Sequence, residues 1–98
     1  MKLALVGIAT LVASFAAGQA AAADGKKVYT ENCAICHNSL TPKLGDKTAW
    51  GPRIKQGTAA LVAAVVKGKG AMPPRAGKAA LVDEDIKAAV EYMVGQAK

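Results

Sequence analysis

The sequence predicts a small all-α protein with a single domain. Beyond residue 23, apolar residues recur every three or four positions in three segments, and no segment alternates apolar and polar residues as a half-buried strand does. Stretches rich in glycine and proline separate the three periodic segments. A chain of 98 residues without an internal repeat has room for one domain. We therefore expect residues 24–98 to form one domain of three to four helices.

Residues 1–23 have the pattern of a secretory signal peptide. Lys2 precedes an apolar stretch from Leu3 to Ala17, and the alanines at 20–23 provide the small residues at which signal peptides are cleaved. We expect cleavage to leave Asp24 as the first residue of a periplasmic protein. The alternative is an uncleaved anchor, because residues 3–23 approach the ~20 residues that span a bilayer.

The first expected helix begins after Asp24, whose carboxylate is a good N-cap. At 3.6-residue spacing, one face of this helix carries Gly25, Val28, Tyr29, Asn32, Cys33 and Cys36. The pattern therefore predicts one helix that reaches both cysteines.

From residue 38 to 57 the helical period is lost, and the frequent glycines and prolines predict an irregular connection. Thr58 is the expected N-cap of a second helix, which ends near Gly68. Its apolar stripe consists of Leu61, Val62, Val65 and Val66.

The third expected helix has the clearest pattern. Three acidic residues, 83–85, stand at its positive dipole end, and Gly95 is expected to close it. One face carries Ile86, Ala89, Val90, Met93 and Val94, which predicts a buried helix face.

The most specific chemical signal lies at residues 33–37, where Cys33, Cys36 and His37 have the spacing of covalent haem attachment. On a helix, residues three or four apart share a face, so the three side chains would enter one pocket. The two thiols can form thioether bonds to the haem vinyl groups, and the imidazole can bind the iron. His37 is the only histidine of the chain, so no other imidazole competes for that role.

Three other uses of the cysteine pair stay open at this point. In an exported protein, Cys33 and Cys36 could form a plain disulfide. A thioredoxin-like redox pair needs strands around it, and none are predicted. A zinc site needs four ligands, whereas one cysteine pair and one histidine supply three. The histidine directly after Cys36 favours haem.

A haem iron bound by His37 can take a second axial ligand, and methionine is the soft candidate: Met72 or Met93. Met93 lies on the apolar face of the last helix, where methionine usually fills the core. Met72 lies between Gly68 and Arg75, in a loop whose glycines and prolines restrict the backbone. The sequence favours Met72 as the ligand. The alternative is a surface methionine beside an open or otherwise ligated iron.

The chain resembles the class I c-type cytochromes and, within them, the cytochrome c5-like group. Four segments carry the resemblance across nearly all of residues 24–98: Cys33–His37, Trp50–Ile54, Ala71–Pro74 and Glu91–Met93. The resemblance implies a cytochrome c fold around one covalent haem c. It also implies axial iron ligation by His37 and Met72, with thioethers from Cys33 and Cys36.

Two structural details follow from the resemblance alone. The carbonyl of Pro52 would accept the imidazole N–H and so orient the proximal ring. The first and last helices would cross closely, with Gly25 and Tyr29 against Val90 and Tyr92.

The chain departs from the c5-like pattern in one respect. Many c5-like proteins carry a further cysteine pair, forming a disulfide, shortly after the methionine loop. Lys78 and Leu81 occupy those approximate positions here, so the loop lacks this disulfide.

These patterns predict an electron carrier and not an enzyme. A haem with both axial positions filled offers no site for oxygen or peroxide, and one-electron exchange changes its geometry little. The competing interpretation is a haem peroxidase or gas-binding haem protein with Met72 displaced. Peroxide cleavage usually recruits a distal acid-base group, and the chain has no second histidine to supply one.

Net charge predicts the character of the partner. Removing Lys2 from the 13 lysines and arginines leaves 12 against 7 acidic residues, a formal charge of +5. This favours redox partners with acidic docking surfaces, such as membrane cytochrome complexes, terminal oxidases or soluble reductases. Nucleic acid is not expected, because export removes access and basic residues are not interleaved with aromatic ones. After signal cleavage we expect no stable membrane insertion.

Overall fold

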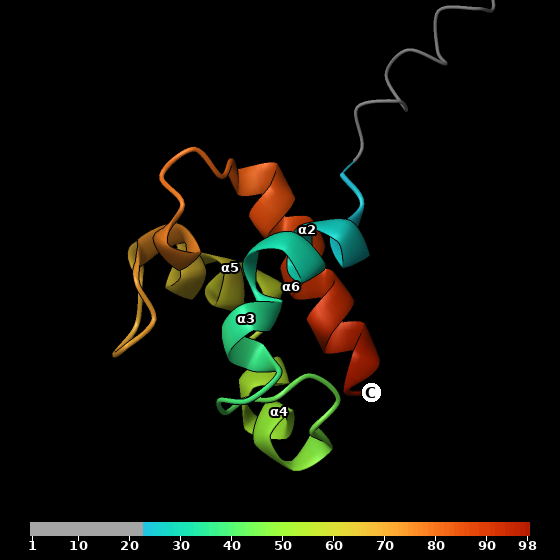
Figure 1. Cartoon of the computed structure of the whole chain (residues 1–98). Coiled ribbons are helices and arrows are strands. Elements are labelled where there is room, and N and C mark those ends of the chain that lie inside the picture. The colour runs from blue at the N-terminus through green and yellow to red at the C-terminus, as the bar shows by residue number, and fades with distance from the viewer. Residues whose placement is uncertain (1–22) are drawn as a thin grey trace, which may run out of the picture.

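A computed structural model describes residues 23–98 (Figure 1). The expected signal peptide, residues 1–23, lies outside these residues except for Ala23. In chain order the elements are α2 (Gly25–Asn32), α3 (Ala34–His37), α4 (Lys47–Ile54), α5 (Thr58–Lys67), the 3-10 helix η1 (Pro74–Gly77) and α6 (Asp83–Gln96). The all-α prediction is confirmed for this part of the chain, although it holds more helices than the three to four expected. None of the described helices has the length and apolar character needed to cross a membrane.

Helices α2 and α6 cross at close range, as expected (Figure 1). A Cβ at Gly25 would overlap the carbonyl oxygen of Ala88 and lie 3.1 Å from the Cβ of Tyr92. The rings of Tyr29 and Tyr92 have their centroids 5.5 Å apart. Glycine is therefore the residue that lets the two backbones approach at this crossing.

The first helix is interrupted, which corrects the prediction of one continuous helix. Its N-cap is Asp24, as predicted, with the carboxylate accepting from the backbone N–H of Lys27 at 3.2 Å. Cys33 stays in the right-handed region, but its φ of −115° departs from the usual helical value; α2 ends at Asn32 and α3 begins at Ala34. The break falls at Cys33, whereas Cys36 and His37 lie on the short helix α3 that follows it.

Helix α4 lies inside the segment expected to be irregular. Asp46 caps it by accepting from the backbone N–H of Ala49 at 3.1 Å. Gly51 and Pro52 both disfavour a helix interior, and proline removes one helical hydrogen bond. Burial of Trp50, which is 4% exposed, offsets that local cost. The prediction of an irregular segment was therefore wrong for residues 47–54.

Two helix ends also differ from the predictions. Gly57, with φ +94°, is the N-cap of α5 in place of Thr58, which is the first helical residue. Helix α6 continues through Gly95 and ends at Gln96. Gly68 ends α5 with φ +85°, as expected for a glycine at that position.

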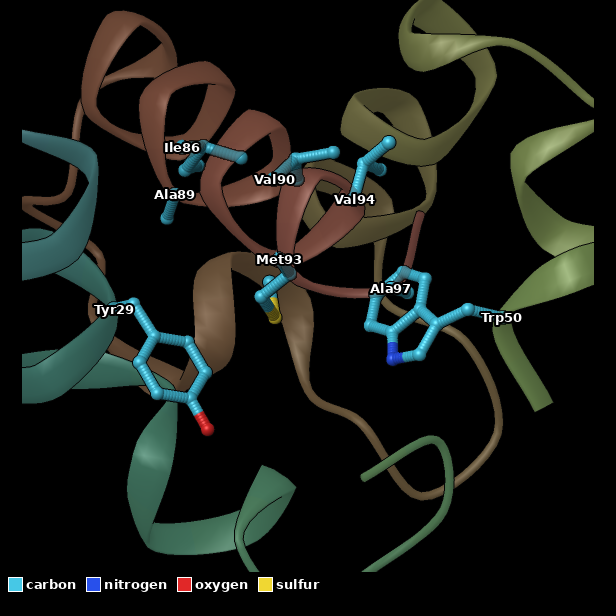
Figure 2. Close-up of a cluster of buried hydrophobic side chains, with 8 residues drawn as sticks. All are labelled: Tyr29, Trp50, Ile86, Ala89, Val90, Met93, Val94 and Ala97. Carbon is cyan, nitrogen blue, oxygen red and sulfur yellow. The ribbon is translucent and has the colours of Figure 1, made fainter. Parts of the chain in front are cut away.

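The core is centred on α6 (Figure 2). Its buried side chains are Tyr29, Trp50, Ile86, Ala89, Val90, Met93, Val94 and Ala97. The apolar stripe of α5 packs against this cluster, as its spacing predicted. Figure 2 shows Tyr29 of α2 and Trp50 of α4 beside the α6 side chains, so three helices contribute buried residues to this core.

Candidate haem-binding site

A cavity of about 380 Å³ adjoins this core. Cys33, Cys36 and His37 contribute to its lining, and so do Met72 and Met93. Its volume lies within the ~300–1,000 Å³ typical of cofactor sites. The fold thus brings His37 and Met72, which are 35 residues apart in the chain, to one cavity.

Cys33 and Cys36 are free thiols in this structure. Cys36 is exposed, whereas Cys33 is half-buried against the core. Burial raises the pKa of the Cys33 thiol. The charge of the nearby Lys78 lowers this pKa, and Cys36 raises it further. The pair therefore stands at the cavity as two thiols of different exposure.

The imidazole of His37 is oriented by the carbonyl of Pro42, 2.8 Å from Nδ1. A carbonyl only accepts, so Nδ1 carries the proton and the lone pair of a neutral ring is on Nε2. That is the tautomer a metal-binding imidazole needs. The backbone around the histidine is held as well, because the N–H of Leu44 donates to the carbonyl of His37 at 3.0 Å.

This contact corrects the assignment of Pro52 as the partner of His37. Pro52 is exposed, lies inside α4 and does not line the cavity. Pro42 was missed because the sequence places both prolines in the same aperiodic segment. The sequence offered one indication in favour of Pro42: it lies only five residues after His37, in a short loop that can fold back onto the histidine.

Met72 is partly buried in a closed loop between α5 and η1. The N–H of Lys69 donates to the carbonyl of Met72 at 2.9 Å, and the N–H of Met72 donates back to the carbonyl of Lys69 at 3.0 Å. Met93, on α6, is 4% exposed and belongs to the core cluster, as its helical spacing predicted.

Trp50 and Arg53 of α4 also line the cavity, so both stand where they can contact a cofactor. The indole N–H of Trp50 donates to the carbonyl of Lys43 at 2.9 Å, which ties α4 to the loop that precedes it. The rings of Trp50 and His37 have centroids 6.5 Å apart. The indole therefore forms the wall next to the histidine.

Comparison with known proteins identifies the family. A family model described as cytochrome c oxidase, cbb3-type, subunit III, matches residues 20–93. Cytochrome c-555 of Chlorobaculum tepidum is 49% identical over 102 residues, which cover 97% of this chain and 94% of that protein. The chain belongs to the class I c-type cytochromes.

Other relatives and a solved structure agree with this placement of the cytochrome. Cytochrome c5 of Azotobacter vinelandii is 37% identical over 79 residues, covering 76% of this chain and 95% of the relative. A solved structure titled as the electron transfer complex of nitrite reductase with cytochrome c contains a chain that is 52% identical, with a TM-score of 0.72. The match covers 76% of this cytochrome and 94% of that chain.

Family membership gives the cytochrome its cofactor, a covalently bound haem c with its iron. The residues present fit that group. One cavity holds two free thiols, an imidazole with its Nε2 lone pair available, and thioether side chains, which are the donors that c-type haem uses. A large flat cofactor would also extend a core whose buried side chains come mostly from one helix.

Proposed function

We propose that this cytochrome is a periplasmic carrier of single electrons with one haem c bound between His37 and Met72. The observation that carries the proposal is the shared cavity, to which the cysteine–histidine segment and the methionine loop both contribute. Cys33 and Cys36 are assigned to the two thioether bonds.

When bound, the haem supplies an iron that changes its charge by one electron. His37 contributes an imidazole whose Nδ1 proton is held by Pro42, so that the ring neither rotates nor changes tautomer during the reaction. Met72 contributes a soft thioether that favours the reduced iron. With both ligands in place there is no free position for peroxide, which supports a carrier over a haem enzyme.

The location and the partner follow from other observations. The expected signal peptide at residues 1–23 supports export, and the charge of +5 without it supports a partner with an acidic docking surface. A reductase is a suitable class of partner, because the structurally similar chain belongs to a complex of nitrite reductase with cytochrome c.

The decisive experiment examines protein expressed with the haem maturation machinery. Haem should stay with the chain on a denaturing gel, and the oxidised protein should show the weak near-infrared band of sulfur-to-iron charge transfer. Met72→Ala should abolish this band and Met93→Ala should retain it. Absence of covalent haem would refute the thioether assignment, and the reverse behaviour of the two variants would make Met93 the ligand.

A further inference from the structure

The segment that follows Met72 has an unusual backbone. Arg75 and Ala76 have φ of +54° and +56°, in the left-handed region that residues with a Cβ rarely adopt. At the start of the same loop, the backbone of Gly68 packs against that of Pro74, and a Cβ at Gly68 would lie 2.8 Å from the backbone nitrogen of Pro74. The loop is thus tightly folded, and contacts beyond it must hold the left-handed pair in place.

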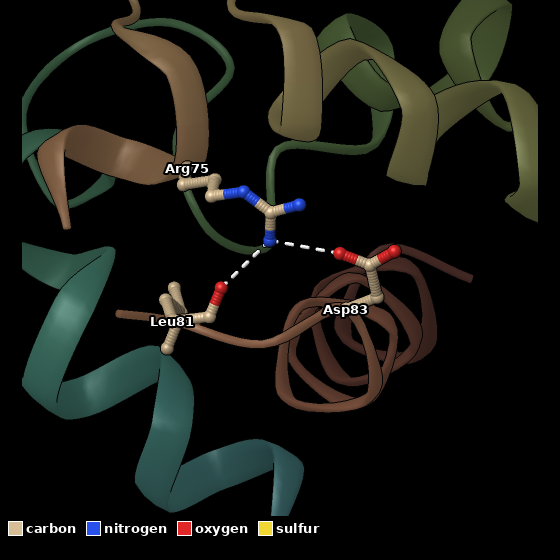
Figure 3. Close-up of polar contacts among 3 residues, drawn as sticks. All are labelled: Arg75, Leu81 and Asp83. Atoms are coloured by element: carbon tan, nitrogen blue, oxygen red, sulfur yellow. Dashed lines mark hydrogen bonds and ion pairs between the residues drawn. The ribbon is translucent and has the colours of Figure 1, made fainter. Parts of the chain in front are cut away.

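The side chain of Arg75 makes those contacts (Figure 3). Its Nη1 donates to the carbonyl of Leu81 at 2.7 Å and lies 2.8 Å from a carboxylate oxygen of Asp83. Asp83 is the first residue of α6, and Ile86, one turn later, is 1% exposed in the core. One guanidinium therefore connects the end of the methionine loop to the most firmly anchored helix.

Lys78 holds the same connection from the other side. Its backbone N–H donates to the carbonyl of Arg75 at 2.9 Å, and its own carbonyl accepts from the N–H of Leu81 at 2.9 Å. Its Nζ reaches the side-chain oxygen of Asn32 at 3.0 Å, at the end of α2. Through these contacts Lys78 links the segment after Met72 both to the residues before α6 and to the end of α2.

We propose that Arg75 is a positioning residue for Met72: by tying the loop to α6, it limits how far the loop can open away from the haem cavity. The inference rests on the proposed role of Met72 as an axial ligand. An external ligand for the iron can bind only when Met72 has moved away, so its affinity measures how readily the loop opens.

The test uses the oxidised holoprotein titrated with imidazole, while the near-infrared band reports the loss of the sulfur ligand. Arg75→Asn removes the guanidinium, and asparagine tolerates the left-handed backbone. The dissociation constant for imidazole should fall about three- to tenfold, the range of a partly exposed charged hydrogen bond. The amide of Met72, which donates to Lys69, should exchange its hydrogen faster in the same variant.

Two variants of α6 make the test specific. Asp83→Asn breaks only the ion pair and should lower the dissociation constant by a smaller factor. Glu84→Gln removes one negative charge from the same helical turn, at an exposed residue with no ion pair among the described contacts, and should leave imidazole binding unchanged. Gly25→Ala, which disturbs the α2–α6 crossing and leaves the Arg75 contacts in place, shows how much a loss of overall stability alone changes imidazole binding.

The outcomes separate this proposal from the one on which it rests. An unchanged dissociation constant in Arg75→Asn overturns the positioning role, provided that the near-infrared band is present. If Arg75→Asn fails to mature, equal constants for Asp83→Asn and Glu84→Gln overturn it instead. A wild-type protein that lacks the band refutes ligation by Met72, and with it the reason for holding the loop.

Discussion

Replacing Gly25 by alanine tests the helix crossing that closes one side of the core. The new Cβ would overlap the carbonyl oxygen of Ala88, and it would lie 3.0 Å from the carbonyl carbon and 3.1 Å from the Cβ of Tyr92. Backbone atoms of a central helix cannot rotate away as a flexible side chain does. The helices must therefore move apart, which weakens the contact between the two tyrosine rings.

The expected magnitude follows from two opposing terms. Overpacking of a well-packed core costs about 1–3 kcal/mol. The gain from replacing glycine in a helix, up to about 1 kcal/mol, is small here because Gly25 is the first residue of α2. We expect a net loss of roughly 2 kcal/mol in the free energy of unfolding, a substantial part of the ~5–15 kcal/mol of a typical domain.

Gly95→Ala is the matched control. Gly95 is exposed near the end of α6, and a Cβ there would meet nothing within 4 Å. The same chemical change should therefore raise the free energy of unfolding, by at most about 1 kcal/mol. Guanidinium chloride unfolding of both holoproteins, followed by far-ultraviolet circular dichroism, measures the two effects.

The two variants should shift the unfolding midpoint in opposite directions, with Gly25→Ala lowering it by roughly 0.5 M at an ordinary denaturant slope. A Gly25→Ala protein as stable as the wild type would refute the reasoning. It would mean that α2 and α6 stand farther apart than the distances at Gly25 imply.

Three other predictions concern the core, an ionisable group and the surface. Met93→Ala should lower the free energy of unfolding by about 2–5 kcal/mol, because Met93 is only 4% exposed. A smaller loss, measured by denaturant unfolding, would show that neighbouring side chains fill the space that the deletion leaves. Burial raises the pKa of Tyr29 above its ordinary value of 10.0, so the unfolded chain releases this proton first. The free energy of unfolding should therefore fall as pH rises beyond about 10. Tyr29→Phe should make that alkaline slope of the unfolding free energy shallower, and an identical slope would count against the buried tyrosine. The rate of electron transfer to an acidic redox partner should decrease as ionic strength rises, whereas a constant rate would mean that the net charge of +5 does not steer encounter.

The sequence by itself determined the features that depend on local spacing. The positions of Cys33, Cys36 and His37 predict haem attachment because the chemistry requires that exact order of donors. The apolar periods of α5 and α6 predicted which residues pack, and they placed Met93 in the core. These inferences needed no knowledge of distant parts of the chain.

Only the tertiary structure decided the features that depend on contacts between segments. Helix α4 forms against the local preferences of Gly51 and Pro52, because burial of Trp50 and its bond to Lys43 outweigh them. The choice of Pro42 as the partner of His37 likewise depends on how a loop folds back.

The polar link from Arg75 to Leu81 and Asp83 is of the same kind. Arginine after two prolines carries no pattern that names its partners, since a long charged side chain can reach in many directions. Its contacts exist because the fold brings the left-handed turn at Arg75 next to Leu81 and the start of α6. Propensity and periodicity describe neighbours along the chain, whereas a contact of this type is set by where the fold brings two segments together.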